Sequence, residues 1–368
     1  MIQKFKSFLS ANAINSSGKS VSQKLVIIES DDWGAIRTPS LEVLKAFEKK
    51  GLDIGKSIYK VDALESQDDL ELLFDVLSKH KDSNNESAKI TANAIMGNPD
   101  FDKIAASNFT EFHYERFTET FKKYPKHKNN LALYNQGQSE CIFHPQLHGR
   151  EHLQYKRWLR VLQSNNEPAH FCFKLGATYS GQGDYSFMEA YDWDSPTDIP
   201  EQIEVLQDAT NIFRETFGYS SKSFIAPCYN WDPLIEPVLK KNGVTWLQGI
   251  RSQMIPTGTF EKYTPLRHYF GKTNSIGLRY NVRNCFFEPS IAPERDFVNS
   301  CLAQISNAFF RNKPAVICSH RINYVGFINE KNRDRGLHDL DQLLKAIVKK
   351  WPDVRFITTD QLSQFTIV

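Results

Sequence analysis

The chain has 368 residues, of which 40% are hydrophobic and 24% charged, and its 45 basic and 43 acidic residues leave a net charge of +2. This length can bury a large core, and the balanced charge without a basic block argues against nucleic acid as a partner. No apolar run approaches the roughly 20 residues of a membrane span, and no signal peptide is evident at the start. We therefore expect a cytoplasmic protein whose six cysteines are free thiols; the sequence indicates no oligomeric state.

Apolar strands alternate with amphipathic helices along the chain. The expected elements in chain order are a strand at 24–30, helices at 41–51 and 68–81, a strand and turn at 88–101, a strand at 139–149, a helix at 151–163, a strand at 170–181, a helix at 200–218, a strand at 222–227, a helix at 232–243, a strand at 244–250, a helix at 296–310, a strand at 315–320, a helix at 337–351 and a strand at 354–359. This alternation predicts a parallel sheet, and seven or eight such strands favour a (β/α) barrel over an open sheet.

Two segments do not fit the repeating βα pattern. Residues 101–140 are polar and aromatic and resemble an insertion, and residues 251–295 form a long excursion with the character of a hairpin. Both could wall a substrate cleft. We expect one domain over residues 1–368, with a core at about 24–362.

Polar side chains collect directly after several of the predicted strands. Glu29, Asp31 and Asp32 follow the first strand, "HPQLHGREH" follows the third, "CYNWD" follows 222–227, and His320 ends "AVICSH". The carboxyl ends of the strands form the functional face of a parallel α/β barrel, so this clustering predicts a site there.

The adjacent aspartates and the closely spaced histidines suggest a metal site. One aspartate can hold a cation while its neighbour serves as a base, although an aspartate pair can also simply cap a turn. His144, His148 and His152 are spaced by four residues, which on a helical turn would let two imidazoles share a metal. Histidines that only make hydrogen bonds are the alternative.

The segment 148–152 also matches H-x-x-E-H, the inverted zinc-peptidase pattern, in which Glu151 would be the general base. That motif needs a formed helix, and Gly149 within it would cost about 1 kcal/mol. The pattern is short enough to occur by chance, so we keep the peptidase as an alternative.

Taken together, "IIESDDWG", "HGREHL", "SFIAPCYNW" and "VICSH" resemble the motifs of the polysaccharide deacetylases of carbohydrate esterase family 4, over about residues 24–330. The resemblance implies the NodB-like fold, a distorted (β/α) barrel of about seven parallel strands. It implies that Asp32, His148 and His152 bind one divalent metal ion, zinc first and cobalt, nickel or iron otherwise. His144 would lie outside this ligand set.

The same resemblance implies a deacetylase that removes an acetyl group from an N-acetylated or O-acetylated sugar. Asp31 would take a proton from water, His320 would protonate the leaving group, and a backbone N–H near Cys228 or Tyr229 would stabilise the oxyanion. The expected partner is thus a carbohydrate, a polysaccharide or a glycan precursor. We expect sugar contacts from an aromatic and polar set: Trp33, Tyr229, Trp231, Tyr324, Arg283 and Asn323.

The chain departs from the family pattern in two places. The family's third motif carries an arginine before a proline, which orients the catalytic aspartate, whereas residues 224–229 contain none. The fourth motif has no match, and in its place stands "NVRNCFFEPS", where Arg283 or Glu288 could substitute. These departures indicate a divergent branch.

Two further alternatives belong to other classes of protein. A glycoside hydrolase on a similar barrel would use two carboxylates, Asp31 together with Asp192, Asp194 or Glu288. A non-catalytic carbohydrate-binding barrel would hold sugar without needing any of these carboxylates for chemistry.

Overall fold

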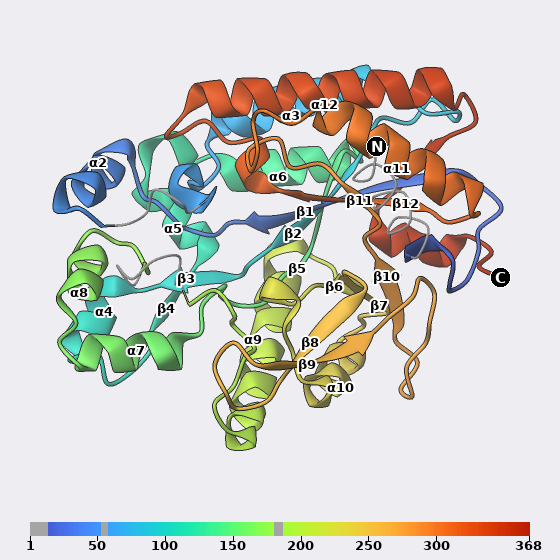
Figure 1. Cartoon of the computed structure of the whole chain (residues 1–368). Helices are drawn as coiled ribbons and strands as arrows, with labels where there is room; N and C mark the ends of the chain where they lie inside the picture. The colour runs from blue at the N-terminus through green and yellow to red at the C-terminus, as the bar shows by residue number, and fades with distance from the viewer. Residues whose placement is uncertain (1–13, 53–57, 180–186) are drawn as a thin grey trace.

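The computed structural model describes residues 14–52, 58–179 and 187–368. Its main sheet consists of parallel strands, and strands β2, β5, β6, β7 and β10 succeed one another on one side of β1 (Figure 1). In spatial order these strands are β10 (Arg279–Val282), β7 (Trp246–Gly249), β6 (Ser223–Phe224), β5 (Phe143–Leu147), β2 (Ile90–Ala94), β1 (Leu25–Trp33), β12 (Ala315–His320) and β11 (Cys285–Phe286). A short strand, β13 (Arg355–Phe356), pairs with the start of β1.

The two edge strands of this sheet follow one another in the sequence. Only Arg283 and Asn284 separate β10 from β11. The Arg283 N–H donates to the carbonyl of Gly249 on β7 (2.8 Å), and the Asn284 N–H donates to the carbonyl of Val316 on β12 (3.1 Å). Two successive residues therefore join opposite edges of the sheet, which confirms the expected distorted (β/α) barrel, with eight strands around it instead of about seven.

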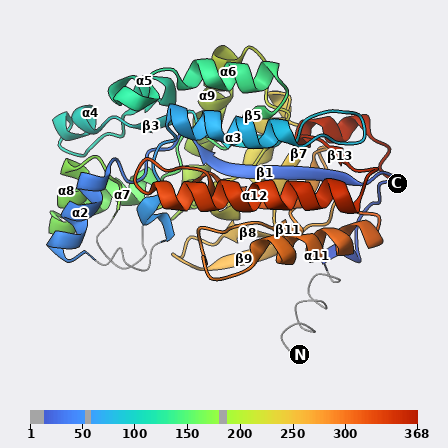
Figure 2. The same ribbon diagram turned by 90° about the horizontal axis from the view of Figure 1, so that it is seen from above.

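Helices cover the outside of the barrel. In Figures 1 and 2, α3 and α12 lie side by side along β1, with α11 next to α12, while α9 and α10 lie on the opposite side. The helices are α2 (Leu41–Lys50), α3 (Gln67–Lys79), α4 (Phe101–Ala106), α5 (Phe117–Lys123), α6 (Asn130–Ser139), α7 (Tyr155–Gln163), α8 (Glu167–Lys174), α9 (Ile199–Phe217), α10 (Glu236–Lys241), α11 (Phe297–Phe310) and α12 (Glu330–Lys350). No helix in the described part of the chain is long and apolar enough to cross a membrane.

Local sequence accounts for the ends of the expected helices. Ser66 and Asp69 form a reciprocal capping box at the start of α3, and each satisfies one backbone N–H that the helix leaves without a partner. Gly51 and Gly218 end α2 and α9 in the left-handed conformation, with φ of 74° and 77°. Glycine adopts this conformation without a steric penalty, so both helices end where the sequence predicted.

The strand expected at 170–181 is wrong, because residues 167–174 form the helix α8 and residues 180–181 lie outside the described residues. The side chain of Asn166 caps this helix by accepting from the Ala169 N–H (2.9 Å). Ala169, Cys172 and Phe173 are its buried residues, and their spacing of three and four follows a helical period. The apolar run was thus one face of a helix.

The two segments that do not fit the βα pattern, 101–140 and 251–295, have different structures. Within 101–140, α6 contacts β5 and α3, so it is the regular helix between β2 and β5 and does not belong to an insertion. The extra part is α4, α5 and a small ribbon of β3 (Gly97–Pro99) with β4 (Tyr114–Arg116). The hairpin expected within 251–295 is confirmed as antiparallel β8 (Ser252–Pro256) and β9 (Tyr263–Arg267).

Candidate active site

A bulge in β1 brings two adjacent aspartates to the carboxyl end of the barrel. Successive residues of a regular strand point to opposite faces, which would separate Asp31 from Asp32. The register between β1 and β2 shifts between Ser30 and Trp33, and Asp32 has a φ of 75°. This irregularity turns the carboxylate of Asp32 toward the same end of the barrel as Asp31.

Asp32, His148 and His152 form a compact group of metal-ligand type. The Asp32 Oδ1 atom lies 3.5 Å from His148 Nε2 and 3.3 Å from His152 Nε2. One ligand atom from each of the three residues lies within 4.8 Å of the other two. The structure therefore brings Asp32, His148 and His152 together, and their role as metal ligands stays a prediction.

The loop between these histidines is not the helical turn that their spacing suggested. His148 directly follows β5, and α7 begins only at Tyr155, so both imidazoles are presented by a loop. Gly149 in this loop has a φ of 105°, and a Cβ atom there would lie 2.7 Å from the Tyr191 hydroxyl oxygen. Glycine is required here for both reasons.

Glu151, the base of the peptidase hypothesis, binds the neighbouring Arg150 with both of its oxygens (2.6 and 3.2 Å). With no helix and an arginine-bound glutamate, the premise of the zinc-peptidase hypothesis is wrong. His144, four residues before His148, lies within β5. It is 3.4 Å from Asp360 and stacks on Tyr219, outside the metal-ligand group.

The surroundings of the three residues favour metal binding. The ring Nδ1 of His148 lies 2.9 Å from the carbonyl of Ile225, so this nitrogen is engaged by the backbone and Nε2 is the ring atom that faces Asp32. Burial alone would raise the pKa of Asp32, but its charged neighbours, Arg37 first, outweigh burial and hold the pKa well below its ordinary value. Burial, aided by Arg37, holds the pKa of His152 well below its ordinary value. An ionised carboxylate beside a neutral imidazole is the state that a divalent ion requires.

Asp31 is held in place by Arg283, which lies outside residues 224–229, where the resemblance placed an orienting arginine. Arg283 donates from Nη1 to Asp31 Oδ2 and from Nη2 to Asp31 Oδ1, both at 2.7 Å. Asn93 donates a further hydrogen bond to Oδ1 (2.8 Å). Burial would raise the pKa of Asp31, but Arg283 outweighs it and lowers the pKa to about 2. Asp31 is therefore an oriented and ionised carboxylate.

Arg283 itself is buried, and this contradicts the expectation that it contacts the substrate. Only 1% of the residue is exposed, and its Nε donates to Glu29 Oε2 (2.7 Å) while both of its Nη atoms bind Asp31. Its position at the junction of β10 and β11 points its side chain into the barrel. An arginine between β10 and β11 thus binds Asp31, and the resemblance had led us to expect such an arginine within residues 224–229.

His320 lies between two carboxylates. Its Nδ1 atom is 2.6 Å from Glu288 Oε1, and its Nε2 atom is 3.8 Å from Asp31 Oδ2. Burial alone would lower its pKa, but Glu288 and then Asp31 outweigh burial and raise the pKa well above its ordinary value. His320 is therefore an imidazolium at neutral pH, and its side chain remains 19% exposed.

Burial contradicts three more of the expected sugar contacts. Asn323 is fully buried and donates to Glu288 Oε2 (2.7 Å). Trp33 packs edge-on against Phe143 in the core, and Trp231 is buried with its ring N–H donating to Glu236 (3.0 Å). Fully buried rings offer no face to a sugar.

The two remaining tyrosines differ from each other. Tyr324 is also fully buried and therefore contradicts its expected sugar contact. Tyr229 is half-buried, and its hydroxyl accepts from Arg283 Nη1 (3.1 Å). Its role as a sugar contact stays a prediction.

The carboxylates of the glycosidase alternative are engaged elsewhere. Arg157 donates to Asp192 (2.5 Å) and to Asp194 (2.8 Å), and Arg160 also binds Asp194. Glu288 is bound by His320 and Asn323. Among the described residues, no candidate pair of carboxylates for this alternative is free of other partners.

Sequence reasoning missed a polar network that fills the barrel beneath Asp31. Asn93 and Gln248 exchange hydrogen bonds of 2.8 and 2.9 Å, and Gln248 donates to Ser223 Oγ (2.7 Å). Glu29 accepts from Asn281 (2.7 Å), as it does from Arg283. The signal was available, because these residues occupy alternate, inward positions of strands that are otherwise apolar.

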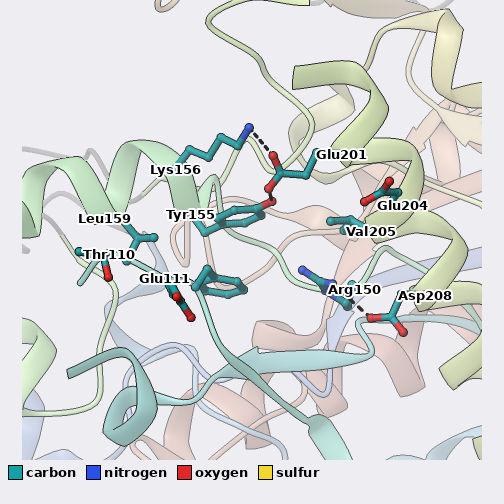
Figure 3. A pocket seen from close by; sticks show the side chains of 11 residues that line it. Thr110, Glu111, Arg150, Tyr155, Lys156, Leu159, Glu201, Glu204, Val205 and Asp208 are labelled. Carbon is teal, nitrogen blue, oxygen red and sulfur yellow. Dashed lines mark hydrogen bonds and ion pairs between the residues drawn. The ribbon is translucent and has the colours of Figure 1, made fainter. Parts of the chain in front are cut away.

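A surface groove of about 620 Å³ lies beside the 148–152 loop, next to α7 and α9 (Figure 3). The Arg150 side chain enters it, donates to Asp208 (3.2 Å) and lies 4.3 Å from the Tyr114 ring. None of the predicted catalytic or metal-binding residues lines this groove. Its lining residues are Thr110, Glu111, Phe112, Arg150, Tyr155, Lys156, Leu159, Glu201, Glu204, Val205 and Asp208.

Solved structures share this fold at low sequence identity. The 4-α-glucanotransferase from Thermococcus litoralis aligns with 94% of this chain and 41% of its own, at 11% identity and a TM-score of 0.50. This chain therefore spans about two fifths of that enzyme, and the likeness concerns the fold alone. A protein described as a glycoside hydrolase/deacetylase from Parabacteroides distasonis aligns with 94% of this chain and 71% of its own, at 7% identity and a TM-score of 0.48.

A peptidoglycan deacetylase from Bacillus subtilis aligns with 93% of this chain and 91% of its own, at 10% identity and a TM-score of 0.36. No family model and no curated protein matches the sequence. The expected fold class, a distorted (β/α) barrel, is confirmed by the order and pairing of the strands of this chain.

Proposed function

We propose that the protein is a metal-dependent deacetylase that removes an acetyl group from an N-acetylated or O-acetylated sugar. The observation that carries this proposal is the placement of Asp31 and His320, 3.8 Å apart, next to the Asp32, His148 and His152 group. A base, an acid and a set of metal ligands thereby converge at the carboxyl end of one barrel.

The three ligands fit a divalent ion such as zinc. One carboxylate and two imidazoles suit zinc, and three protein ligands leave positions open for reacting groups, as in catalytic zinc sites. When bound, such an ion supplies Lewis acidity that polarises a carbonyl and acidifies water. The remaining requirements are met by side chains of the chain itself.

Asp31 has the hydrogen-bonding capacity of a proton acceptor. Its Oδ1 atom accepts from both Arg283 and Asn93, whereas Oδ2 accepts from Arg283 alone. A carboxylate oxygen has two lone pairs, so Oδ2 keeps one, and Oδ2 is also the oxygen that lies 3.8 Å from His320 Nε2. We infer that this lone pair takes the proton of the attacking water.

His320 would act as the acid for the departing amine or alcohol. Its Nε2 atom points toward Asp31, while Nδ1 donates to Glu288. The glutamate fixes the ring orientation and keeps the imidazolium protonated until the leaving group needs the proton. The N–H of Tyr229 donates to the carbonyl of Ala226 within its turn, which leaves the N–H of Cys228 as the proposed oxyanion donor.

The substrate class is proposed from this chemistry and from the fold. An acetamide or acetate ester of a sugar needs an activated water, a stabilised oxyanion and a protonated leaving group, and the site offers a residue for each. Half-buried Tyr229 remains as an aromatic contact for a sugar ring.

The test begins with the metal content of the purified protein, measured by elemental mass spectrometry beside His148→Ala. About one ion per chain that is lost in the variant, followed by acetate release from N-acetylated or O-acetylated sugars, would support the proposal. A wild-type protein that binds no ion after incubation with zinc or cobalt would overturn it.

A further inference from the structure

A second group of metal-ligand type lies on the far side of His320. Glu288, Cys318 and His320 each offer one ligand atom, and these atoms lie within 4.8 Å of one another. The Glu288 Oε1 atom is 2.6 Å from His320 Nδ1 and 3.7 Å from Cys318 Sγ. None of these three residues belongs to the Asp32, His148 and His152 group, and the two groups use no ligand atom in common.

The strand geometry explains why these atoms meet. Cys318 and His320 are two residues apart on β12, so both side chains point into the barrel. Glu288 follows β11, which is the parallel neighbour of β12. Asn323 holds the other oxygen of Glu288 at 2.7 Å, so Oε1 stays directed at the histidine and the cysteine.

The spacing and the ligand types fit a tetrahedral zinc site. Bonds of about 2.0 to 2.3 Å place neighbouring ligand atoms of such a site roughly 3.3 to 3.8 Å apart. The distance of 3.7 Å from Glu288 to Cys318 lies in this range, and the 2.6 Å contact needs only a small opening of the Glu288–His320 pair. The 19% exposure of the His320 side chain leaves a route for an ion and for a water as fourth ligand.

The surroundings of Cys318 are compatible with a thiolate ligand. Arg283 Nη1 lies 3.4 Å from the sulfur and the Tyr229 hydroxyl lies 3.5 Å from it. Arg283 donates a hydrogen bond of the kind that stabilises sulfur bound to a metal, and the Tyr229 hydroxyl can either donate or accept. Burial raises the pKa of the Cys318 thiol, so the bound ion has to displace its proton. A cysteine in this position also distinguishes the second group chemically from the first, which contains no sulfur.

We propose that Glu288, Cys318 and His320 form a second divalent-cation site, selective for zinc-like ions, whose occupation inhibits the enzyme. The inhibitory effect rests on the proposed function, whereas the binding itself does not. On binding, the Cys318 thiol proton and the His320 Nδ1 proton pass to solvent, and the ion takes both positions. The ring then keeps a proton on Nε2 alone, and loss of that proton would leave an imidazolate, so His320 no longer serves as an acid.

The experiment is a titration of the metal-free protein with Co²⁺, followed by absorbance and by native mass spectrometry. Cobalt bound to a thiolate gives an intense charge-transfer band in the near ultraviolet, which a site of carboxylate and imidazole lacks. We expect two ions per chain, with the band belonging to the weaker ion. Cys318→Ser should remove the band and the second ion, and His148→Ala should remove the first ion and keep the band.

Cys228 provides the matched control, because its thiol is exposed and lies near the same end of the barrel. Cys228→Ser should keep the band. A single ion per chain at saturation, or a band that survives Cys318→Ser, would overturn the proposal. Circular dichroism of each variant verifies folding, and Glu288→Gln, which keeps the side-chain shape, should weaken the second ion if Cys318→Ser does not fold.

Activity then tests the consequence separately. With an acetylated sugar that the protein hydrolyses, zinc beyond one equivalent should lower the rate by roughly 10²-fold, the smaller end of what a general acid contributes. A rate that stays constant while the second ion binds would refute the inhibition, while the binding site itself would still be supported. Two ions without activity on any acetylated sugar would instead count against the proposed function.

Discussion

The two ends of the barrel interior are built from the same strands and differ in chemistry. Toward the amino ends of the strands, Leu25, Ile27, Val316 and Trp246 belong to one buried apolar cluster. Toward the carboxyl ends, the next inward positions on the same strands carry Glu29, Asp31, Cys318, His320 and Gln248. A shift of two to four residues along a strand thus separates the apolar end from the polar end.

This difference shows how the fold divides stability from function. The apolar end gains free energy by removing side chains from water, which is largely independent of the exact identity of each residue. The polar end buries charges that are costly unless every one is bonded, and Arg283 satisfies two of them at once. Substitutions at the two ends should therefore affect different measurable quantities.

The largest expected effect is at the polar end, on catalysis. Asp31→Asn keeps the shape of the side chain and removes the proton acceptor, so the rate of acetate release should fall by about 10² to 10⁴-fold. The free energy of unfolding should also fall, because Arg283 loses one of its two buried carboxylate partners and the lowered pKa of Asp31 means that its charge stabilises the folded state. Steady-state kinetics and urea unfolding would measure the two, and full activity in the variant would exclude Asp31 as the base.

Removal of Arg283 should give the next largest effect, on stability. Arg283→Met leaves Glu29 and Asp31 buried without their shared cation, and breaking a buried ion pair costs about 3 to 5 kcal/mol. The midpoint of urea unfolding should fall accordingly, and activity should fall with it because Asp31 loses its orientation. A triple variant that also carries Glu29→Gln and Asp31→Asn should recover much of the stability.

If Arg283→Met alone were as stable as the wild type, the charges at this end would be solvated in some other way, and the contrast between the two ends would be lost.

The site was predictable where the signal is local in the sequence. Asp31 and Asp32, the loop with His148 and His152, and His320 all follow apolar strands, and polar residues after such strands predict a site at the barrel's carboxyl end. These five residues do come together in the structure.

The rest depended on contacts between distant segments. Arg283 reaches Asp31 because two consecutive residues close the barrel, and nothing in the sequence near residue 283 reveals which strands it joins. The bulge at Asp32 likewise depends on the pairing with β2. Trp33 and Trp231 were misjudged because an aromatic residue beside a site motif looks the same in sequence whether its ring faces the cleft or the core.

At the apolar end we expect a loss of stability without a loss of catalysis. Ile27 is fully buried and lies opposite Val316 in the register of β1 and β12. Ile27→Ala should lower the free energy of unfolding by about 2 to 5 kcal/mol, and Ile27→Val by about 0.5 to 1.5 kcal/mol. The rate per folded molecule should match the wild type in both, and a rate that falls in Ile27→Val would mean that the two ends are mechanically coupled.

The smallest expected effect is a shift in the pH dependence of the rate. It should occur for substitutions at the polar end of the barrel and not for those at the apolar end. Burial lowers the pKa of His320, but Glu288 and Asp31 outweigh it and raise the pKa well above its ordinary value. In the proposed mechanism the protonated ring is the active form, so the rate should hold at neutral pH and fall only as the pH rises through this raised pKa. The ion pair of His320 with Glu288 stabilises the folded state fully below a pH of about 6.5, the ordinary pKa of histidine. This stability is lost as the pH rises through the raised pKa of His320.

Glu288→Gln removes the charge that raises the pKa of His320 and keeps the hydrogen-bonding shape of the side chain. The alkaline limb of the pH–rate profile should therefore move to lower pH. The profiles are compared at one metal ion per chain, with Ile27→Val as the control whose limb should not move. An unchanged limb in Glu288→Gln would mean that a group other than His320 donates the proton.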